Sequence, residues 1–336
     1  MKICVLGAGS WGMALTRLLA NNGHEVYVWS IDEDEINMLK KFSEHKTKLP
    51  GVKIPGSVEY TTDMGTALED RELVVMAVPS PYIRSTARNA APYIKENEII
   101  VNVAKGIEET TLKRLSEVIS EEIPQAQVAI LSGPSHAEEV GKDIPTTVVV
   151  GAPTQELAKF VQDVFMGDRF RVYTSPDMIG IELGGAVKNV IALAAGIADG
   201  LGCGDNTKAA LITRGIYELT SLGVAMGGKP ETFSGLSGTG DLIVTCASQH
   251  SRNRRAGYLM GQGYTYKEAM DCVKMIVEGV YSAKAALELS KQYNIQMPIV
   301  EVVNKILFED YPAQEALNDL LTRDKKSEAS TLVWGN

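Results

Sequence analysis

A glycine-rich turn between a short apolar strand and a helix constrains the fold of this chain more than any other feature. The motif Gly7-Ala8-Gly9-Ser10-Trp11-Gly12 follows the apolar run Lys2–Leu6 and opens the amphipathic stretch Trp11–Asn22. In this setting the first glycine permits a tight turn, the second lets the backbone approach a pyrophosphate, and the third lets helix and strand pack closely. Gly7, Gly9 and Gly12 are therefore predicted to bind a dinucleotide, with the pyrophosphate on the helix N-terminus. A glycine turn that binds no ligand is the alternative.

The first half of the chain alternates short apolar runs with amphipathic helical stretches. Apolar strands separated by helices indicate a doubly wound, mainly parallel sheet, so we expect an α/β, Rossmann-like domain. The expected strands are Lys2–Leu6, Val26–Trp29, Leu73–Ala77, Ile99–Val103, Val128–Leu131 and Thr147–Val150. The expected helices are Trp11–Asn22, Ile83–Tyr93, Leu112–Glu122 and Gln155–Phe165.

After Tyr173 the pattern becomes almost entirely helical, which predicts a C-terminal all-α domain. We expect a dinucleotide-binding domain over 1–178, a helical substrate and catalytic domain over 179–325, and a solvated tail over 326–336. The expected helices are an apolar segment ending at Ala198, then Thr207–Met226, Arg252–Met260, Thr265–Cys272, Val280–Tyr293, Ile299–Phe308 and Ala313–Leu321.

Composition narrows the class of protein. The net charge of −9 argues against a general nucleic-acid binder, because such proteins carry a basic footprint. The 4 cysteines show no paired metal-ligand spacing and no disulfide framework, so we expect reduced thiols and no metal site. The chain enters its first strand directly, without the pattern of a signal peptide, and a cytoplasmic protein without a membrane span is the expectation.

A single charge stands within the most apolar helical stretch. Between Leu183 and Ala198 the chain reads LGGAVKNVIALAAGIA, where Lys188 alone is ionisable. Burying an ammonium group is costly unless it is paired. One helical turn away lie Gly184, Gly185 and Ala192, and this face of small side chains is interpreted as leaving room for a ligand. A lysine that snorkels at a helix margin is the alternative.

Three loops follow expected strands at the sheet edge where open α/β folds bind ligands, and they begin at Val78, Val103 and Leu131. Lys105, between Ala104 and Gly106, is interpreted as a cation that faces the ligand; a surface lysine is the alternative. In the third loop Gly133 and Ser135 offer a backbone N–H and a hydroxyl to an anion. His136 could transfer a proton, but a histidine that begins a helix is more often a cap or a surface residue.

Two further motifs lie in the helical half. Ser237-Gly238-Thr239-Gly240-Asp241 is a glycine-rich turn that ends in a carboxylate. Ser251-Arg252-Asn253-Arg254-Arg255 stands just ahead of a helix. Arginine forks match phosphate oxygens and a helix N-terminus favours anions, so this motif is typical of a phosphate site. A solvated basic helix start is the alternative.

The end of the second strand usually selects between NAD and NADP. Here it reads Trp29-Ser30-Ile31-Asp32, and no lysine or arginine stands at positions 30–33. An acidic group there favours the free ribose hydroxyl of NAD, but Asp32 lies two residues late and could instead cap the next helix. The local charge slightly favours NAD, but the choice between NAD and NADP stays open.

Taken together, these segments resemble the bacterial-type NAD(P)-dependent glycerol-3-phosphate dehydrogenases. The resemblance covers essentially the whole chain in the family's order and rests on seven segments: GAGSWG at 7–12, AKG at 104–106, SGPS at 132–135, GGAVKN at 184–189, GTGDL at 238–242, SRNRR at 251–255 and VEG at 277–279. It implies an oxidoreductase that interconverts dihydroxyacetone phosphate and sn-glycerol 3-phosphate for phospholipid synthesis, with NAD or NADP as cofactor.

The resemblance also implies roles for individual residues. Lys188 would be the catalytic proton donor and acceptor. Contacts to the phosphorylated substrate would come from Lys105, Gly133, Ser135, Lys188, Asp241, Ser251, Arg252 and Asn253. Besides the glycines, the cofactor site would include Ser10, Trp11, Lys105, Ala137, Arg252, Ile276 and Glu278. Asn189 and Thr245 match polar positions near the reacting centre. Many relatives carry a basic residue where this chain has Ile31, which puts the family's usual NADP preference in doubt.

Two other functions remain as alternatives. A β-hydroxyacid dehydrogenase would share the layout and the helix lysine but would favour a carboxylate site over the motif at 251–255. A non-catalytic dinucleotide sensor would not need Lys188 together with Asp241. The helical half could also supply the face of a homodimer, although no sequence stripe identifies one.

Overall fold

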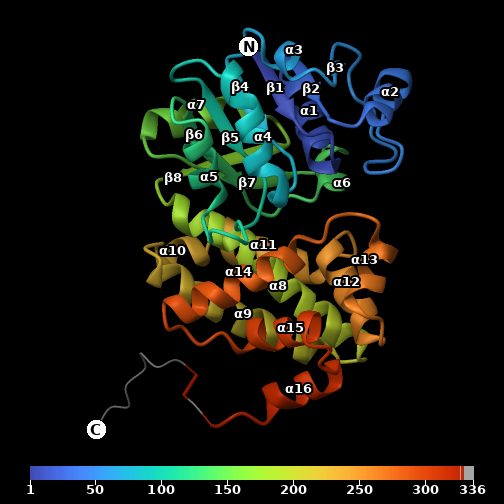
Figure 1. Ribbon diagram of the computed structural model, residues 1–336, viewed down its shortest axis with the longest axis vertical. Helices are drawn as coiled ribbons and strands as arrows, with labels where there is room; N and C mark the ends of the chain where they lie inside the picture. Colours follow the sequence, from blue (N-terminus) through green and yellow to red (C-terminus); the bar gives the residue numbers. More distant parts are fainter. Residues whose placement is uncertain (326, 329–336) are drawn as a thin grey trace.

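The computed structural model describes residues 1–325, 327 and 328, and it shows a sheet-containing domain above a helical one (Figure 1). Within the described residues the sheet has 8 strands in the order β3-β2-β1-β4-β5-β6-β7-β8. The strands are β1 (Lys2–Leu6), β2 (Glu25–Trp29), β3 (Glu59–Thr61), β4 (Leu73–Met76), β5 (Ile99–Asn102), β6 (Gln127–Ser132), β7 (Thr146–Gly151) and β8 (Phe170–Ser175).

The sheet is parallel except at one junction. β1 pairs with β2 and β4 in parallel, with Ile3 opposite Val26 and Leu73, whereas β7 runs antiparallel to β6 and parallel to β8. Side chains of β1 alternate between the two faces, since Ile3 and Val5 join one apolar core and Cys4 and Leu6 the other. Both faces are therefore buried, as a doubly wound fold requires.

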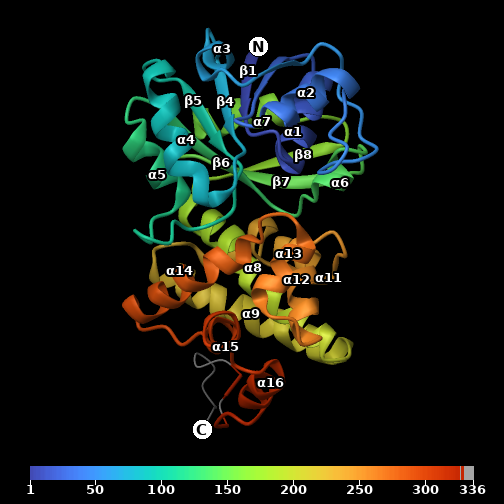
Figure 2. The same ribbon diagram turned by 45° about the vertical axis from the view of Figure 1, so that its right-hand side comes forward.

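Helices cover both faces of this sheet. They are α1 (Ser10–Asn21), α2 (Glu33–Phe42), α3 (Met64–Leu68), α4 (Ile83–Ala90), α5 (Leu115–Glu122), α6 (Ala137–Val140) and α7 (Gln155–Phe165). Residues of α1 and α7 pack in one core, and residues of α4 and α5 pack in the other. Figure 2 shows α4 and α5 on the side of the sheet away from α1 and α2.

The helical domain is built around one long helix, α8 (Met178–Gly200), which crosses its centre in both views (Figures 1 and 2). The other helices of this domain are α9 (Asp205–Ala225), α10 (Pro230–Phe233), α11 (Asp241–Ala247), α12 (Arg252–Gly261), α13 (Tyr266–Val273), α14 (Glu278–Gln292), α15 (Pro298–Phe308) and α16 (Ala313–Leu321). Among the described residues, α8 alone is long and apolar enough to cross a membrane, but 89% of its most apolar window is buried inside the protein. It is the core of this domain.

The fold class predicted from sequence is confirmed, with corrections in detail. The helix expected from Leu112 begins at Leu115, because Leu112 has a φ of +61° and the preceding residues form a small hairpin closed at Ile107 and Arg114. The sequence analysis also missed β3 and β8, which are short or half-exposed edge elements with little apolar patterning. Of the expected tail, positions 326 and 329–336 lie outside the described residues, while Glu328 offers its carbonyl to Arg214.

Candidate active site

Two lysines from different domains share one buried carboxylate. Lys188 on α8 donates from Nζ to Oδ1 of Asp241, at the start of α11, and to Oγ1 of Thr245 at 2.7 Å. Lys105, which follows β5, donates from Nζ to Oδ2 of Asp241 at 2.7 Å and to the Gly133 carbonyl at 2.9 Å. The structure thus brings together five residues that were singled out along the sequence, namely Lys105, Gly133, Lys188, Asp241 and Thr245.

Burial governs the electrostatics of this group. Lys188 is 5% exposed and Asp241 is 1% exposed. Burial lowers the pKa of Lys188 to about 8; Asp241 counteracts this shift and Lys105 adds to it. Burial alone would raise the pKa of Asp241, but the ammonium groups of Lys105 and Lys188 hold it below its ordinary value. An ammonium group whose pKa lies close to neutral pH, held beside a carboxylate, suits reversible proton transfer.

The fold places these side chains at the carboxyl edge of the sheet, where it meets the helical domain. Lys105 and Gly133 follow the ends of the adjacent strands β5 and β6. Gly133 has a φ of +137°, which glycine adopts readily, and its carbonyl also accepts from Ser135 Oγ at 2.9 Å. The turn Leu236–Gly240 forms a short π-helix that ends where α11 begins, at Asp241. Such turns occur frequently at functional sites.

The start of α12 lies next to the same group. Ser251 caps α12 by accepting from Arg254 N at 3.2 Å, and Arg252 is the first helical residue. Asn253 donates from Nδ2 to Asn189 Oδ1 at 2.9 Å and accepts from Gly279 N at 2.8 Å. Asn189 directly follows Lys188, so the helix start that carries Arg252 is tied to the lysine-bearing segment of α8.

The glycine turn fits a dinucleotide. Gly7 has a φ of +118°, and a Cβ there would lie 2.8 Å from the Ala77 backbone. A Cβ on Gly12 would lie 2.0 Å from the Gly7 carbonyl oxygen, whereas a Cβ on Gly9 would meet nothing within 4 Å. Gly7 and Gly12 thus serve the chain's own packing, and open space remains at Gly9, where no side chain caps α1. Ser10 is buried, and Trp11 Nε1 is buried without a partner among the described residues.

The other expected cofactor residues lie at the starts of α14 and α6. Glu278, at the start of α14, accepts from Ser80 N at 3.1 Å and from Ser80 Oγ. Burial raises the pKa of Glu278 above its ordinary value, and Ser80 and Arg252 offset only part of this rise. Ile276 is half-buried just before α14, and Ala137 is buried at the start of α6. Ser80 lies in the loop from Val78 to Pro81, which was expected at the ligand-binding edge of the sheet, but no role was predicted for Ser80 itself, because its place at a strand end was its only signal.

Comparison with known proteins decides the family. The family model described as "NAD-dependent glycerol-3-phosphate dehydrogenase N-terminus" matches residues 2–158, and the model of the corresponding C-terminus matches residues 177–318. This chain belongs to the NAD-dependent glycerol-3-phosphate dehydrogenase family. It is 61% identical to glycerol-3-phosphate dehydrogenase (NAD(P)+) of Agathobacter rectalis over 333 residues, which cover 99% of each chain. The enzyme of the same name from Fusobacterium nucleatum is 59% identical over 98% of each chain.

Solved structures agree with this assignment. Glycerol-3-phosphate dehydrogenase from Coxiella burnetii superposes with a TM-score of 0.93 at 38% identity, covering 96% of this chain and 99% of that one. A PanE/ApbA family ketopantoate reductase from Ralstonia eutropha reaches a TM-score of 0.62 at 16% identity, which shows a shared fold alone. The family models and the curated relatives thus support a glycerol-3-phosphate dehydrogenase rather than the hydroxyacid dehydrogenase or the sensor.

Two interpretations from sequence need correction in this family member. The small residues around Lys188 do not leave an open space: a Cβ on Gly184 would lie 2.5 Å from the Ser237 carbonyl, and one on Gly185 would lie 3.3 Å from Lys105 Cγ. They let neighbouring chain segments approach α8 closely. His136 precedes α6 but forms no side-chain cap; its ring lies 6.0 Å from that of His250, and Nε2 is buried without a partner among the described residues.

Proposed function

We propose that Lys188 is the acid–base group with which this NAD(P)-dependent glycerol-3-phosphate dehydrogenase interconverts dihydroxyacetone phosphate and sn-glycerol 3-phosphate. The reaction is an oxidation or reduction at C2 of the substrate, and its product serves as the backbone of glycerophospholipids. The observation that carries the assignment is the pair of ammonium groups on the single carboxylate of Asp241, one of them on the buried Lys188.

Proton transfer is the task of the chain's own residues. The nicotinamide, when bound, supplies the hydride to C2 or accepts it from C2. During reduction Lys188 Nζ donates a proton to the oxygen on C2, and during oxidation neutral Lys188 removes it. Asp241 and Thr245 orient the ammonium group, and Lys105 places a second positive charge beside the oxygen that becomes negative.

Substrate binding is assigned to the surrounding polar groups. Lys105, Gly133 and Ser135 would contact the substrate from the sheet domain, and Ser251, Arg252 and Asn253 would hold its phosphate at the start of α12. Arginine binds phosphate oxygens in a fork, and the helix start adds unpaired N–H groups. Fixing the phosphate away from the reacting carbon orders C2 against Lys188, which lowers the barrier.

The cofactor would lie along the sheet domain. The fit of the glycine turn supports placing the pyrophosphate at Gly9 and Ser10, with Trp11, Ala137, Ile276 and Glu278 around the rest of the molecule.

We place the domain boundary between 178 and 179, at the beginning of α8. This division is supported by the two large apolar cores, since one lies wholly before it and the other, apart from Ile107 and Leu112, lies after it. A homodimer and a cytoplasmic location stay predictions; sedimentation of the whole chain tests the first.

Replacing Lys188 tests the assignment. The variant Lys188→Ala should lose at least ~10²-fold in kcat for reduction of dihydroxyacetone phosphate, since a positioned acid–base group contributes about that much. Binding of NADH, followed by fluorescence titration, should stay within a few-fold of the wild type. Near-normal turnover by the variant contradicts the role of Lys188. A wild-type chain that reduces hydroxyacids better than dihydroxyacetone phosphate contradicts the proposed substrate.

A further inference from the structure

Another buried charge on α8 takes no part in the reaction described above. Glu182 lies six residues before Lys188, a distance of ~9 Å along the helix axis, and is 8% exposed. Its carboxylate accepts from Ser116 N at 2.8 Å, from Ser116 Oγ at 2.6 Å and from Arg114 Nη1 at 2.8 Å. A buried carboxylate that lacked such donors would be strongly destabilising. The three donors hold it in place.

All three donors come from the sheet domain. Arg114 is the N-cap residue of α5, and Ser116 lies in the first turn of the same helix, where backbone N–H groups have no partner within the helix. Glu182 reaches across from the helical domain and supplies that partner. The contact therefore joins the start of α5 to the lysine-bearing helix α8.

The chain from Lys105 to Arg114, here named the connecting loop, links this contact to the reacting centre. At one end Lys105 binds Asp241. At the other end Arg114 binds Glu182. Between them the loop folds back on itself, with a bridge between Ile107 and Arg114 and a bond from Glu108 N to the Lys113 carbonyl at 3.0 Å. Its two ends are thus held close together by backbone pairing.

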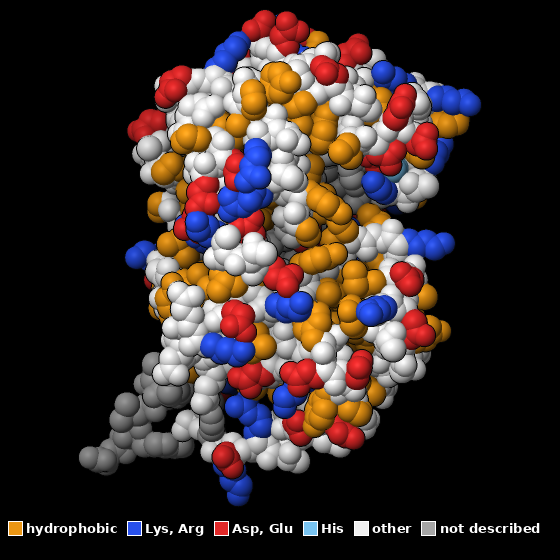
Figure 3. Space-filling model, viewed as in Figure 1, with side chains coloured by type: hydrophobic (Ala, Val, Ile, Leu, Met, Phe, Trp, Pro, Cys, Tyr) orange, Lys and Arg blue, Asp and Glu red, His pale blue; other side chains and the backbone are white. Residues whose placement is uncertain are grey.

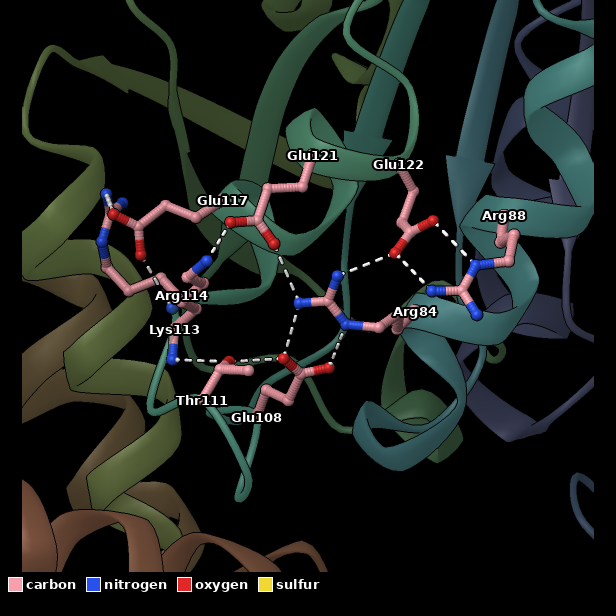
Figure 4. A network of polar contacts seen from close by, with 9 residues as sticks. All are labelled: Arg84, Arg88, Glu108, Thr111, Lys113, Arg114, Glu117, Glu121 and Glu122. Atoms are coloured by element: carbon pink, nitrogen blue, oxygen red, sulfur yellow. Dashed lines mark hydrogen bonds and ion pairs between the residues drawn. The ribbon is translucent and has the colours of Figure 1, made fainter.

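The connecting loop is also fixed to the body of the sheet domain. Arg84 on α4 binds both oxygens of Glu108 through a two-pronged contact, each bond 2.7 Å long, and reaches Glu122 of α5 at 2.7 Å (Figure 4). Such forked pairs define geometry more tightly than single bonds do. These contacts fix the loop between Lys105 and the Arg114–Glu182 contact.

We propose that Glu182 is a positioning residue that, through Ser116, Arg114 and the connecting loop, sets the distance between Lys105 and Lys188. The two lysines belong to different domains, and Asp241 is the carboxylate that binds both of these like charges. A second attachment six residues away on α8 fixes the orientation of that helix against the sheet domain. The inference rests on the proposed roles of Lys188 and Lys105.

The expected signature is electrostatic. The groups that influence Lys188 are Asp241 and Cys246 of α11, Lys105 of the connecting loop and His136 at the start of α6. Because Lys105 lowers the pKa of Lys188, a looser attachment that lets Lys105 move away should raise it. A residue that merely stabilises the fold would not raise this pKa, and the loss of a negative charge alone would lower it.

The test compares Glu182→Gln with the wild-type enzyme. The amide keeps the size of the side chain but cannot accept from all three donors. For Glu182→Gln we expect kcat for reduction of dihydroxyacetone phosphate to fall by about tenfold or more, since small misplacements of reacting groups are costly. The pKa in the pH profile of kcat should rise, and the dissociation constant of NADH should stay within about twofold, because the pyrophosphate site at α1 is untouched.

Glu117→Gln is the matched control. Glu117 also pairs with Arg114, at 2.8 Å, but it is half-exposed, and its carboxylate binds Arg114 within the sheet domain rather than a residue of α8. We expect its kcat and pH profile to match the wild type. Should Glu182→Gln fail to fold, Ser116→Ala removes only the hydroxyl donor and should shift the pH profile in the same direction by a smaller amount.

Two results overturn the inference. One is a pH profile of Glu182→Gln that coincides with the wild type while only the melting temperature falls. The other is an equal effect of Glu117→Gln. Failure of the proposed function looks different, because Lys188→Ala would then turn over dihydroxyacetone phosphate near-normally, or the wild-type enzyme itself would not turn it over.

Discussion

At the scale of single residues, charge placement decides the chemistry. Lys188 was recognisable in the sequence because an unpaired ammonium group does not belong in an apolar helix. Its pairing with Asp241 was predicted, and the structure shows that contact. Glu182 and Glu218 were not recognisable, because a carboxylate at a helix start or within a mixed helix looks like any solvated residue until its tertiary partners are known.

Ile31 provides a prediction about cofactor choice. It follows β2, is 84% exposed, and stands before Asp32, whose side chain accepts from Glu35 N at 3.1 Å as the cap of α2. Because the first turn of α2 carries Glu33, Asp34 and Glu35, a ribose phosphate would meet negative charge there. We expect kcat/KM to be higher with NADH than with NADPH. The variant Ile31→Arg should raise kcat/KM for NADPH by about tenfold, since a basic residue there accommodates the added phosphate.

Parallel titrations of both cofactors give a second readout for this substitution. The dissociation constant of NADPH should fall in Ile31→Arg, while that of NADH should change little. Ile144→Arg, at another exposed isoleucine, is the control and should change neither value. A wild-type preference for NADPH would contradict the prediction.

At the scale of elements, the helices end and begin where tertiary contacts allow. α15 has no side-chain cap of its own; instead Glu218 of α9 accepts from Ile299 N at 2.9 Å and Val300 N at 3.3 Å. The apolar periodicity of α15 was visible in the sequence, but its cap lies about eighty positions away in the chain. The antiparallel pairing of β7 with β6 likewise depends on long-range packing, which strand-like composition alone does not reveal.

Glu218 predicts a pH dependence of stability. Burial raises the pKa of Glu218 to about 8 in the folded protein, whereas in the unfolded chain the pKa is near 4.5. The carboxyl group therefore ionises more easily in the unfolded chain. The folded protein therefore loses stability as the pH rises from the lower to the upper value, by at most ~1.4 kcal/mol per pH unit. Glu218→Gln removes this contribution, and its melting temperature should depend less on pH over this range.

Calorimetry on both sides of this pH range measures the effect. Glu315→Gln removes an exposed carboxylate from α16 and is the control, with the same pH dependence as the wild type. Parallel curves for Glu218→Gln and the wild type would contradict the buried-carboxylate explanation.

At the scale of the whole molecule, the proposed active site lies where the two domains meet. Figure 3, in the view of Figure 1, shows a hollow in the surface between the sheet domain and the helical domain. Sequence patterning predicted both domains and the change near α8, because strand and helix periods differ. It could not predict that Lys105 of one domain and Lys188 of the other would share Asp241. That arrangement depends on how the domains pack. The family resemblance, rather than periodicity, placed all three residues in one substrate site.

If Lys188 transfers the proton, kcat should depend on pH in opposite ways for reduction and for oxidation. Burial lowers the pKa of Lys188 to about 8. Reduction of dihydroxyacetone phosphate needs the protonated lysine, so kcat should fall as the pH rises through that value. Oxidation of sn-glycerol 3-phosphate needs the neutral lysine, so kcat should rise through the same value. Profiles that both rise, both fall or stay flat near that pH would contradict the assignment.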